Sequence, residues 1–209
     1  SSRVLQGELS LYCSVTASYS FLYDILSHFR NDYPGIEIKL HTGDPAQAVE
    51  RVTTGREDIA IGARPDTLPR GVAFRPILRS PLLFIAPADQ PDLATALNGP
   101  ARADAWRDVP MILSEEGLSR QRLDQWFRAL GVTPRIYAQV SGNEAIVSMV
   151  SLGFGVGVAP RIVLENSPLA ERTRPLQVEP ALEDYEVGLF TLEKRLTDPV
   201  IQAFWSQLR

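Results

Sequence analysis

Polar and apolar residues alternate with a period of two in two early segments, residues 7–13 and 36–42. This alternation predicts strands that bury one face. A short apolar run at 59–62 predicts a third, fully buried strand. Between the first two strands, apolar residues recur at the spacing of an amphipathic helix, namely Phe21, Leu22, Ile25, Leu26 and Phe29. Strands separated by helices of this length favour βαβ units and a mostly parallel sheet.

Capping and turn residues set the limits of these elements. The small polar segment 14–18 suits the N-cap of the first helix. The sequence Tyr-Pro-Gly at 33–35 ends that helix. Asp44 and Pro45 suit the N-cap and first position of a second helix, which we expect to end near Gly55.

The same pattern returns in the second half of the chain after a change in composition. A strand at 84–87 is followed by residues 88–110, which are rich in Ala, Asp and Pro and which we interpret as the passage into a second lobe. Further elements are predicted as strands at 111–113, 135–140, 156–159 and 187–191, and as helices at 118–130, 143–152 and 199–208. The chain therefore reads as an α/β protein with two lobes.

Composition and charge narrow the classes of function. The net charge is −4 and no run of Lys and Arg occurs, so we expect that this chain does not itself contact DNA. The single cysteine, Cys13, excludes an intramolecular disulfide and agrees with a cytoplasmic location. No apolar stretch is long enough to span a membrane, and we expect no signal peptide.

Three segments in order carry a family resemblance. They are Gly7-x-Leu9 with the strand and helix that follow, the Gly-x-x-Asp-x-Ala-Ile pattern of residues 55–61, and the helix–glycine–strand segment 150–160. Together they resemble the effector-binding domain of LysR-type transcription regulators. The resemblance implies a periplasmic-binding-protein-like fold (type II), with two Rossmann-like lobes joined by two crossing strands near Ala86 and Gly188. Lobe I would comprise residues 1–86 and 188–209, and lobe II residues 87–187.

The resemblance also implies partners. LysR regulators carry an N-terminal winged helix-turn-helix. We expect this domain to be absent from these residues, so DNA would be contacted only through that missing domain. Homodimers or homotetramers are implied, and the helix from Ser18 and the strand from Ile36 are the expected contact surface. No membrane partner and no cofactor are expected.

Finer features are similar to one branch of the family, the regulators of acetohydroxy acid isomeroreductase. They occur in the segments 13–19, 39–44, 143–150, 162–168 and 194–205. This similarity implies an activator of branched-chain amino acid biosynthesis genes. Its small acidic effector would be 2-acetolactate or 2-aceto-2-hydroxybutyrate.

A candidate effector site follows from the fold class, because ligands of open α/β sheets bind where strands end and helices begin. We predict that the effector binds between the lobes and contacts Ser14, Thr16, Ser18, Thr42, Gly43, Arg64, Ser114 and Asn143. Other roles are open for several of them. One of the three residues in segment 14–18 is expected to be a plain N-cap, and Asn143 could be another. Arg64 offers a fork for a carboxylate, or forms a salt bridge or a solvated loop contact.

Enzymatic and metal-dependent functions lack a motif. Cys13 has no evident base and is expected to be a packing residue. His28 and His41 do not form a zinc signature, and the glycines at 153–157 follow a helix instead of opening one, so the dinucleotide fingerprint fails. We expect no catalytic residue and no metal. The main alternative to a regulator is a free-standing solute-binding protein of the same fold.

Overall fold

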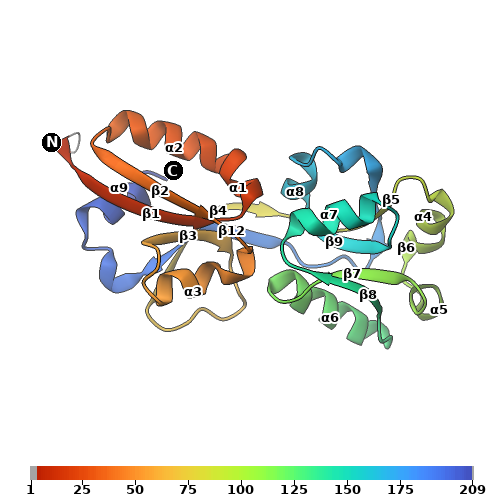
Figure 1. Ribbon diagram of the computed structural model, residues 1–209. Coiled ribbons are helices and arrows are strands. Elements are labelled where there is room, and N and C mark those ends of the chain that lie inside the picture. The colour runs from red at the N-terminus through yellow and green to blue at the C-terminus, as the bar shows by residue number, and fades with distance from the viewer. Residues whose placement is uncertain (1–3, 209) are drawn as a thin grey trace. The chain divides into compact units, whose positions relative to one another are not determined.

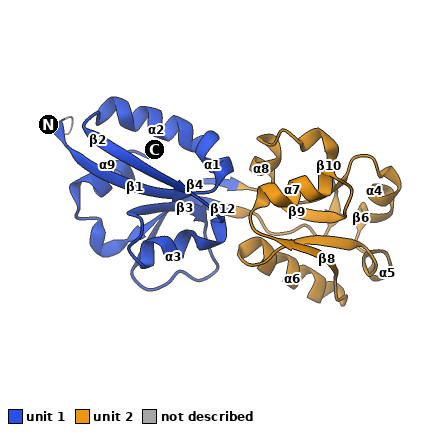
Figure 2. Ribbon diagram, in the orientation of Figure 1, with its two compact units in different colours: residues 1–79, 186–209 blue, residues 80–185 orange. Residues whose placement is uncertain are grey.

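The structure is a computed structural model that describes residues 4–208 (Figure 1). The chain divides into two compact units, which are coloured separately in Figure 2. Unit 1 comprises residues 1–79 and 186–209, and unit 2 comprises residues 80–185. Each unit is built on its own five-stranded sheet.

The sheet of unit 1 has the strand order β2-β1-β3-β12-β4. Its strands are β1 (Gly7–Cys13), β2 (Ile36–Thr42), β3 (Ile59–Ala63), β4 (Val72–Ser80) and β12 (Tyr185–Leu192). β1 runs parallel to both β2 and β3, whereas β12 runs antiparallel to β3. The predicted period of two is confirmed in β1, where the alternate residues Leu9, Leu11 and Cys13 are fully buried.

Helices cover both faces of this sheet, with α2 on one side and α3 on the other (Figure 1). The helical elements are α1 (Val15–Tyr19), α2 (Phe21–Asp32), η2 (Pro45–Gln47), α3 (Ala48–Thr53), η4 (Glu193–Arg195) and α9 (Pro199–Ser206). Phe29 of α2 packs edge-on against Phe204 of α9, with ring centroids 5.1 Å apart. The predicted first helix is confirmed, and a separate five-residue helix, α1, precedes it.

Unit 2 has a five-stranded sheet and a separate pair of two-residue strands. The sheet order is β10-β5-β9-β7-β8, formed by β5 (Leu82–Pro87), β7 (Pro110–Ser114), β8 (Arg135–Val140), β9 (Val156–Pro160) and β10 (Thr173–Pro175). The pair is β6 (Gly99–Pro100) with β11 (Val178–Glu179). The helical elements are α4 (Pro91–Leu97), α5 (Ala103–Trp106), α6 (Leu118–Leu130), α7 (Asn143–Ser151), α8 (Arg161–Glu165) and η3 (Ala170–Arg172).

The segment 88–110, which we interpreted as the passage into a second lobe, contains regular elements that were not predicted. These are α4, β6 and α5. Pro91 stands at the first position of α4, where a missing N–H costs nothing. The segment also buries Trp106 completely. Its residues are therefore part of the core of unit 2.

The glycines of the helix–glycine–strand segment serve close packing. A Cβ atom at Gly155 would lie 2.3 Å from the carbonyl oxygen of Pro110, and one at Gly157 would lie 2.6 Å from a methyl group of Ile146. Gly153 has φ +91° and ends the turn after α7. These contacts let β9 approach β7 and α7, as expected for glycines that follow a helix.

The aspartate of the Gly-x-x-Asp-x-Ala-Ile pattern at residues 55–61, Asp58, also has a structural role. The Asp58 carboxylate accepts hydrogen bonds from the amide of Ser10 at 2.9 Å and from Arg195 at 2.6 Å. The Thr191 hydroxyl donates to the Asp58 carbonyl at 2.7 Å. Asp58 thus joins β1, β12 and η4 at the start of β3.

Candidate functional site

In unit 1, the predicted site residues lie at the carboxyl edge of the sheet. Cys13 and Thr42 are register partners in the parallel pair of β1 and β2, so Ser14 and Gly43 follow them side by side. β3 is parallel to β1 and ends at Ala63, directly before Arg64. The parallel order therefore brings three loops to one edge, as the sequence predicted.

The segment after β1 is a short helix with one capping serine. Ser14 is the N-cap of α1, and its hydroxyl accepts a hydrogen bond from the amide of Ala17 at 3.2 Å. The Ser18 hydroxyl donates to the Val15 carbonyl at 2.5 Å. Thr16 is only 2% exposed. Ser14 and Ser18 are half-buried, so their hydroxyls are the more accessible groups of this segment.

Thr42, the last residue of β2, and Gly43, the first residue of the loop after it, are both exposed. The Gly43 amide donates to the carbonyl of Cys13 at 3.0 Å, so this N–H is already used within the protein. Of these two residues, Thr42 offers the group that is suited to a ligand, its side-chain hydroxyl.

Arg64 is half-buried in the loop after β3. Its backbone amide donates to the Glu186 carbonyl at 2.7 Å, and its Nη1 donates to the Pro65 carbonyl at 3.1 Å. The guanidinium carbon lies 6.0 Å from the ring centroid of Phe74. In the described part of unit 1 no carboxylate lies within 4.0 Å of this guanidinium. The hydrogen bond of its amide fixes the backbone of Arg64, while several N–H groups of its guanidinium remain for an anion.

In unit 2, Ser114 and Asn143 lie at the carboxyl edge of the second sheet. Ser114 pairs with Val140 in the parallel ladder of β7 and β8. The amide of Glu115 donates to the Val140 carbonyl at 3.0 Å, which holds the two strand ends together. The Ser114 carbonyl accepts a hydrogen bond from Arg120 Nη1 at 2.9 Å, so its hydroxyl is the free polar group.

Asn143 does not cap α7, contrary to one of its expected roles. The N-cap is Gly142, which has φ +87°, and Asn143 is the first helical residue. Its position follows from the glycine, because a left-handed turn at 142 favours a residue without a Cβ. Asn143 is 8% exposed, and its amide forms no hydrogen bond within the described part of unit 2. Neither polar atom of this side-chain amide is among the fully buried atoms that lack a partner, so the amide is open to a hydrogen bond with water or a ligand.

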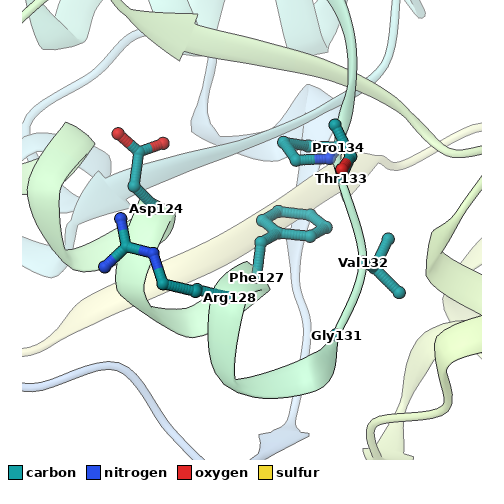
Figure 3. Close-up of a pocket in the computed structure, with 7 residues that line it drawn as sticks. All are labelled: Asp124, Phe127, Arg128, Gly131, Val132, Thr133 and Pro134. Carbon is teal, nitrogen blue, oxygen red and sulfur yellow. The ribbon is translucent and has the colours of Figure 1, made fainter.

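Two hollows of unit 2 differ from this predicted site. A cavity of about 10 Å³ beside Ser114, Ser119 and Arg120 has room for one water molecule only. A wider hollow of about 360 Å³ lies at the end of α6 (Figure 3), lined by Asp124, Phe127, Arg128, Gly131, Val132, Thr133 and Pro134. It borders the amino end of β8, at the opposite end of the strands from Ser114. None of the predicted residues lines it.

Cys13, the candidate nucleophile, is a packing residue. Cys13 is fully buried, and burial raises the pKa of its thiol to about 12, so the thiolate is disfavoured at neutral pH. Among residues 4–208, no cluster of three or more His, Cys, Asp or Glu side chains is arranged to hold a metal ion.

No helix among residues 4–208 is long and apolar enough to cross a membrane.

Comparison with known proteins defines the family. The family model described as the LysR substrate binding domain matches residues 2–209. The chain belongs to the LysR family. The HTH-type transcriptional activator IlvY of Salmonella typhimurium is 45% identical to this LysR domain over 209 residues, covering 98% of this chain and 70% of that protein. The HTH-type transcriptional regulator IlvY of Escherichia coli K12 is 44% identical over 207 residues, covering 98% and 69%. These relatives are named as transcription regulators and not as enzymes.

Solved structures confirm the fold of the LysR domain. The regulatory domain of Synechocystis CcmR in complex with 2-PG matches with a TM-score of 0.81 and 27% identity, covering 97% of this chain and 96% of that one. The effector binding domain of QuiR in complex with shikimate matches with a TM-score of 0.80 and 19% identity, covering 96% and 94%. The periplasmic-binding-protein-like α/β fold predicted from the sequence is therefore confirmed. The chain is the effector-binding domain of a LysR-type transcriptional activator similar to IlvY.

Proposed function

We propose that this domain senses 2-acetolactate or 2-aceto-2-hydroxybutyrate and thereby activates genes of branched-chain amino acid biosynthesis in the cytoplasm. The observation that carries the proposal is the 45% identity to IlvY activators across 98% of the chain. The segments that suggested this branch of the family lie in both units, so the similarity is not confined to one part of the fold.

The chemistry of the two strand edges suits such an effector. Each candidate effector carries a carboxylate, a hydroxyl group and a keto oxygen. Arg64 provides a cation for the carboxylate, and the hydroxyls of Ser14, Ser18 and Thr42 surround the same edge of unit 1. The unpartnered amide of Asn143 in unit 2 would donate to a hydroxyl or keto oxygen.

We place DNA binding outside this domain and assembly on an outer surface of unit 1. The net charge of −4 argues against phosphate contacts by this domain, so we propose that a separate helix-turn-helix domain binds DNA. We also propose that unit 1 contributes to a homodimer. Its edge strand β2 presents Leu40 at 38% exposure, and α2 presents Tyr23 at 66%. An edge strand beside exposed apolar side chains suits association with a second copy.

Thermal unfolding with candidate effectors tests the proposal. At one hundred times its dissociation constant, a ligand adds about 2.7 kcal/mol of stability. For a chain of this size we expect a rise in Tm of about 5–10 °C with either acetohydroxy acid. Pyruvate and the branched-chain amino acids should give no comparable rise. A selective response to one of those control compounds would keep the sensor role and reject the proposed effector.

Replacing Arg64 with Gln should weaken binding of the effector. The loss of one charge-assisted hydrogen bond, about 1.5–3 kcal/mol, corresponds to a dissociation constant about 10- to 150-fold higher. Arg70→Gln in the same loop is the matched control, because Arg70 is exposed and one position before Gly71. Calorimetric titration of both variants should separate them. Equal affinities for the two variants would remove Arg64 from the site.

A further inference from the structure

Tyr12 contacts the loop that begins at Gly43, directly after the proposed effector contact Thr42. Tyr12 belongs to β1 and is only 2% exposed. Its hydroxyl donates to the backbone carbonyl of Asp44 at 2.8 Å. Together with the hydrogen bond from the Gly43 amide to Cys13, this contact fastens the loop to β1 at two points.

The loop rests directly on the Tyr12 side chain. A Cβ atom at Gly43 would lie 2.4 Å from the Tyr12 hydroxyl oxygen and 3.2 Å from two of its ring carbons. Such distances are too short for non-bonded atoms, so a glycine is needed where the backbone passes over the phenol. The position of the loop therefore depends on where the ring of Tyr12 is held.

An ionic cluster around the buried Glu57 carboxylate holds that ring. The Arg51 guanidinium lies 4.7 Å from the Tyr12 ring centroid. Arg51 donates from Nε and Nη2 to the two carboxylate oxygens of Glu57, each at 2.6 Å. His41 Nδ1 lies 2.8 Å from Glu57 Oε1, and the Glu57 side chain is 1% exposed. The bidentate pair fixes the guanidinium plane, and the plane limits the movement of the phenol.

The Tyr12 hydroxyl keeps its proton in this setting. Burial raises the pKa of Tyr12 above its ordinary value, although the charge of Arg51 opposes the shift. The hydroxyl is thus a hydrogen-bond donor throughout the neutral range. Asp44 offers only a carbonyl at this point, so donor and acceptor are matched.

We propose that Tyr12 is a positioning residue for effector binding, whose hydroxyl holds Thr42 and Gly43 in the conformation that binds the effector. The inference rests on the proposed function of this edge. Tyr12 is too buried to be a ligand contact itself, so it acts through the loop. Sequence patterns pointed to the loop but not to Tyr12, because the tyrosine stands in a strand and its partners come from α3 and the turn at 57.

The variant Tyr12→Phe removes the hydroxyl and keeps the ring. With 2-acetolactate as the probe, we expect binding about 3- to 10-fold weaker, as for the loss of one intramolecular hydrogen bond. Amide hydrogen exchange in residues 43–47 should become about 5-fold faster by the same reasoning. Tyr137→Phe is the matched control, since Tyr137 is 53% exposed on β8 of unit 2, and it should change neither quantity.

A double-mutant cycle with Gly43→Ala tests the contact directly. The added methyl group collides with the Tyr12 hydroxyl, so Gly43→Ala alone should weaken binding of 2-acetolactate strongly. In the Tyr12→Phe background the nearest atom is gone and the penalty should be smaller. The affinity of the double variant for 2-acetolactate should therefore fall by less than the product of the two single losses.

The outcomes separate this inference from the proposed function. If the wild-type chain binds no acetohydroxy acid, the proposed effector fails, and hydrogen exchange alone decides whether Tyr12 positions the loop. Unchanged exchange at 43–47 in Tyr12→Phe overturns the inference whatever the effector is. Faster exchange with unchanged affinity overturns it too, because the loop conformation would then be irrelevant to binding.

Discussion

Arg51→Met should destabilise the chain by about 3–5 kcal/mol at neutral pH, the range for removing one partner of a buried ion pair. The reason is that Glu57 stays behind with its side chain 1% exposed and loses both hydrogen bonds from Arg51. His41 remains beside the carboxylate but is itself 58% exposed and forms a single contact. Urea unfolding monitored by circular dichroism measures the difference.

The effect of Arg51→Met should depend on pH in a defined direction. Hydrogen bonds from Arg51 hold the pKa of Glu57 below its ordinary value, and His41 adds to this against the opposing effect of burial. A carboxyl with a lowered folded-state pKa stabilises the protein above its unfolded pKa of about 4.3 and loses that contribution as the pH falls through the folded value. The penalty of the variant should therefore be full at pH 7 and shrink below about pH 4.

Two further variants decide whether the buried charge is the cause. Arg56→Met, at an exposed position in the next turn, should change stability by no more than about 0.5 kcal/mol. Adding Glu57→Met to Arg51→Met removes the uncompensated carboxylate and should recover much of the loss. A penalty that is the same at every pH and persists in the double variant would mean that Arg51 acts by packing alone.

The regular elements were predictable where one face of a strand or helix is buried. In β1 and α2 the burial repeats at the period of the element, and the apolar residues repeat with it. β4 was missed because its polar residues Arg75 and Arg79 interrupt the alternation and only its first and last residues are buried. α4 and α5 were missed because short helices rich in Ala and Asp have the composition of a linker.

The candidate site was likewise predictable in part. Strand order placed Ser14, Thr42 and Arg64 correctly at one edge, since parallel strands end together. The cap of α7 was misassigned because a glycine with positive φ took the place of a polar cap. The partners of Glu57 could not be predicted from local patterns. They come from β2 and α3, and only the packed structure shows that this carboxylate is buried.

The aromatic core of unit 2 is centred on Trp106. It is fully buried, and its ring centroid lies 4.9 Å from those of Phe84 and Trp126 and 6.0 Å from that of Phe127. Trp106→Ala removes these contacts and leaves a cavity. We therefore expect a loss of about 3–5 kcal/mol and, for a chain of this size, a fall in Tm of about 6–20 °C.

The indole nitrogens of Trp106 and Trp126 differ in their hydrogen bonding, and this difference predicts different costs for replacing each tryptophan with phenylalanine. Trp106 Nε1 is buried with no hydrogen-bond partner among the described residues, whereas Trp126 Nε1 donates to the Pro180 carbonyl at 2.8 Å. Trp106→Phe should therefore cost about 1 kcal/mol or less, because loss of an unpaired donor offsets part of the lost packing. Trp126→Phe should cost about 1–3 kcal/mol, since it leaves a carbonyl without its partner.

Urea unfolding of Trp106→Ala, Trp106→Phe and Trp126→Phe measures the order of these costs. Equal costs for the two phenylalanine variants would show that the Trp106 N–H is satisfied. That result would leave the large effect of Trp106→Ala intact, because it arises from the cavity and not from the hydrogen bond.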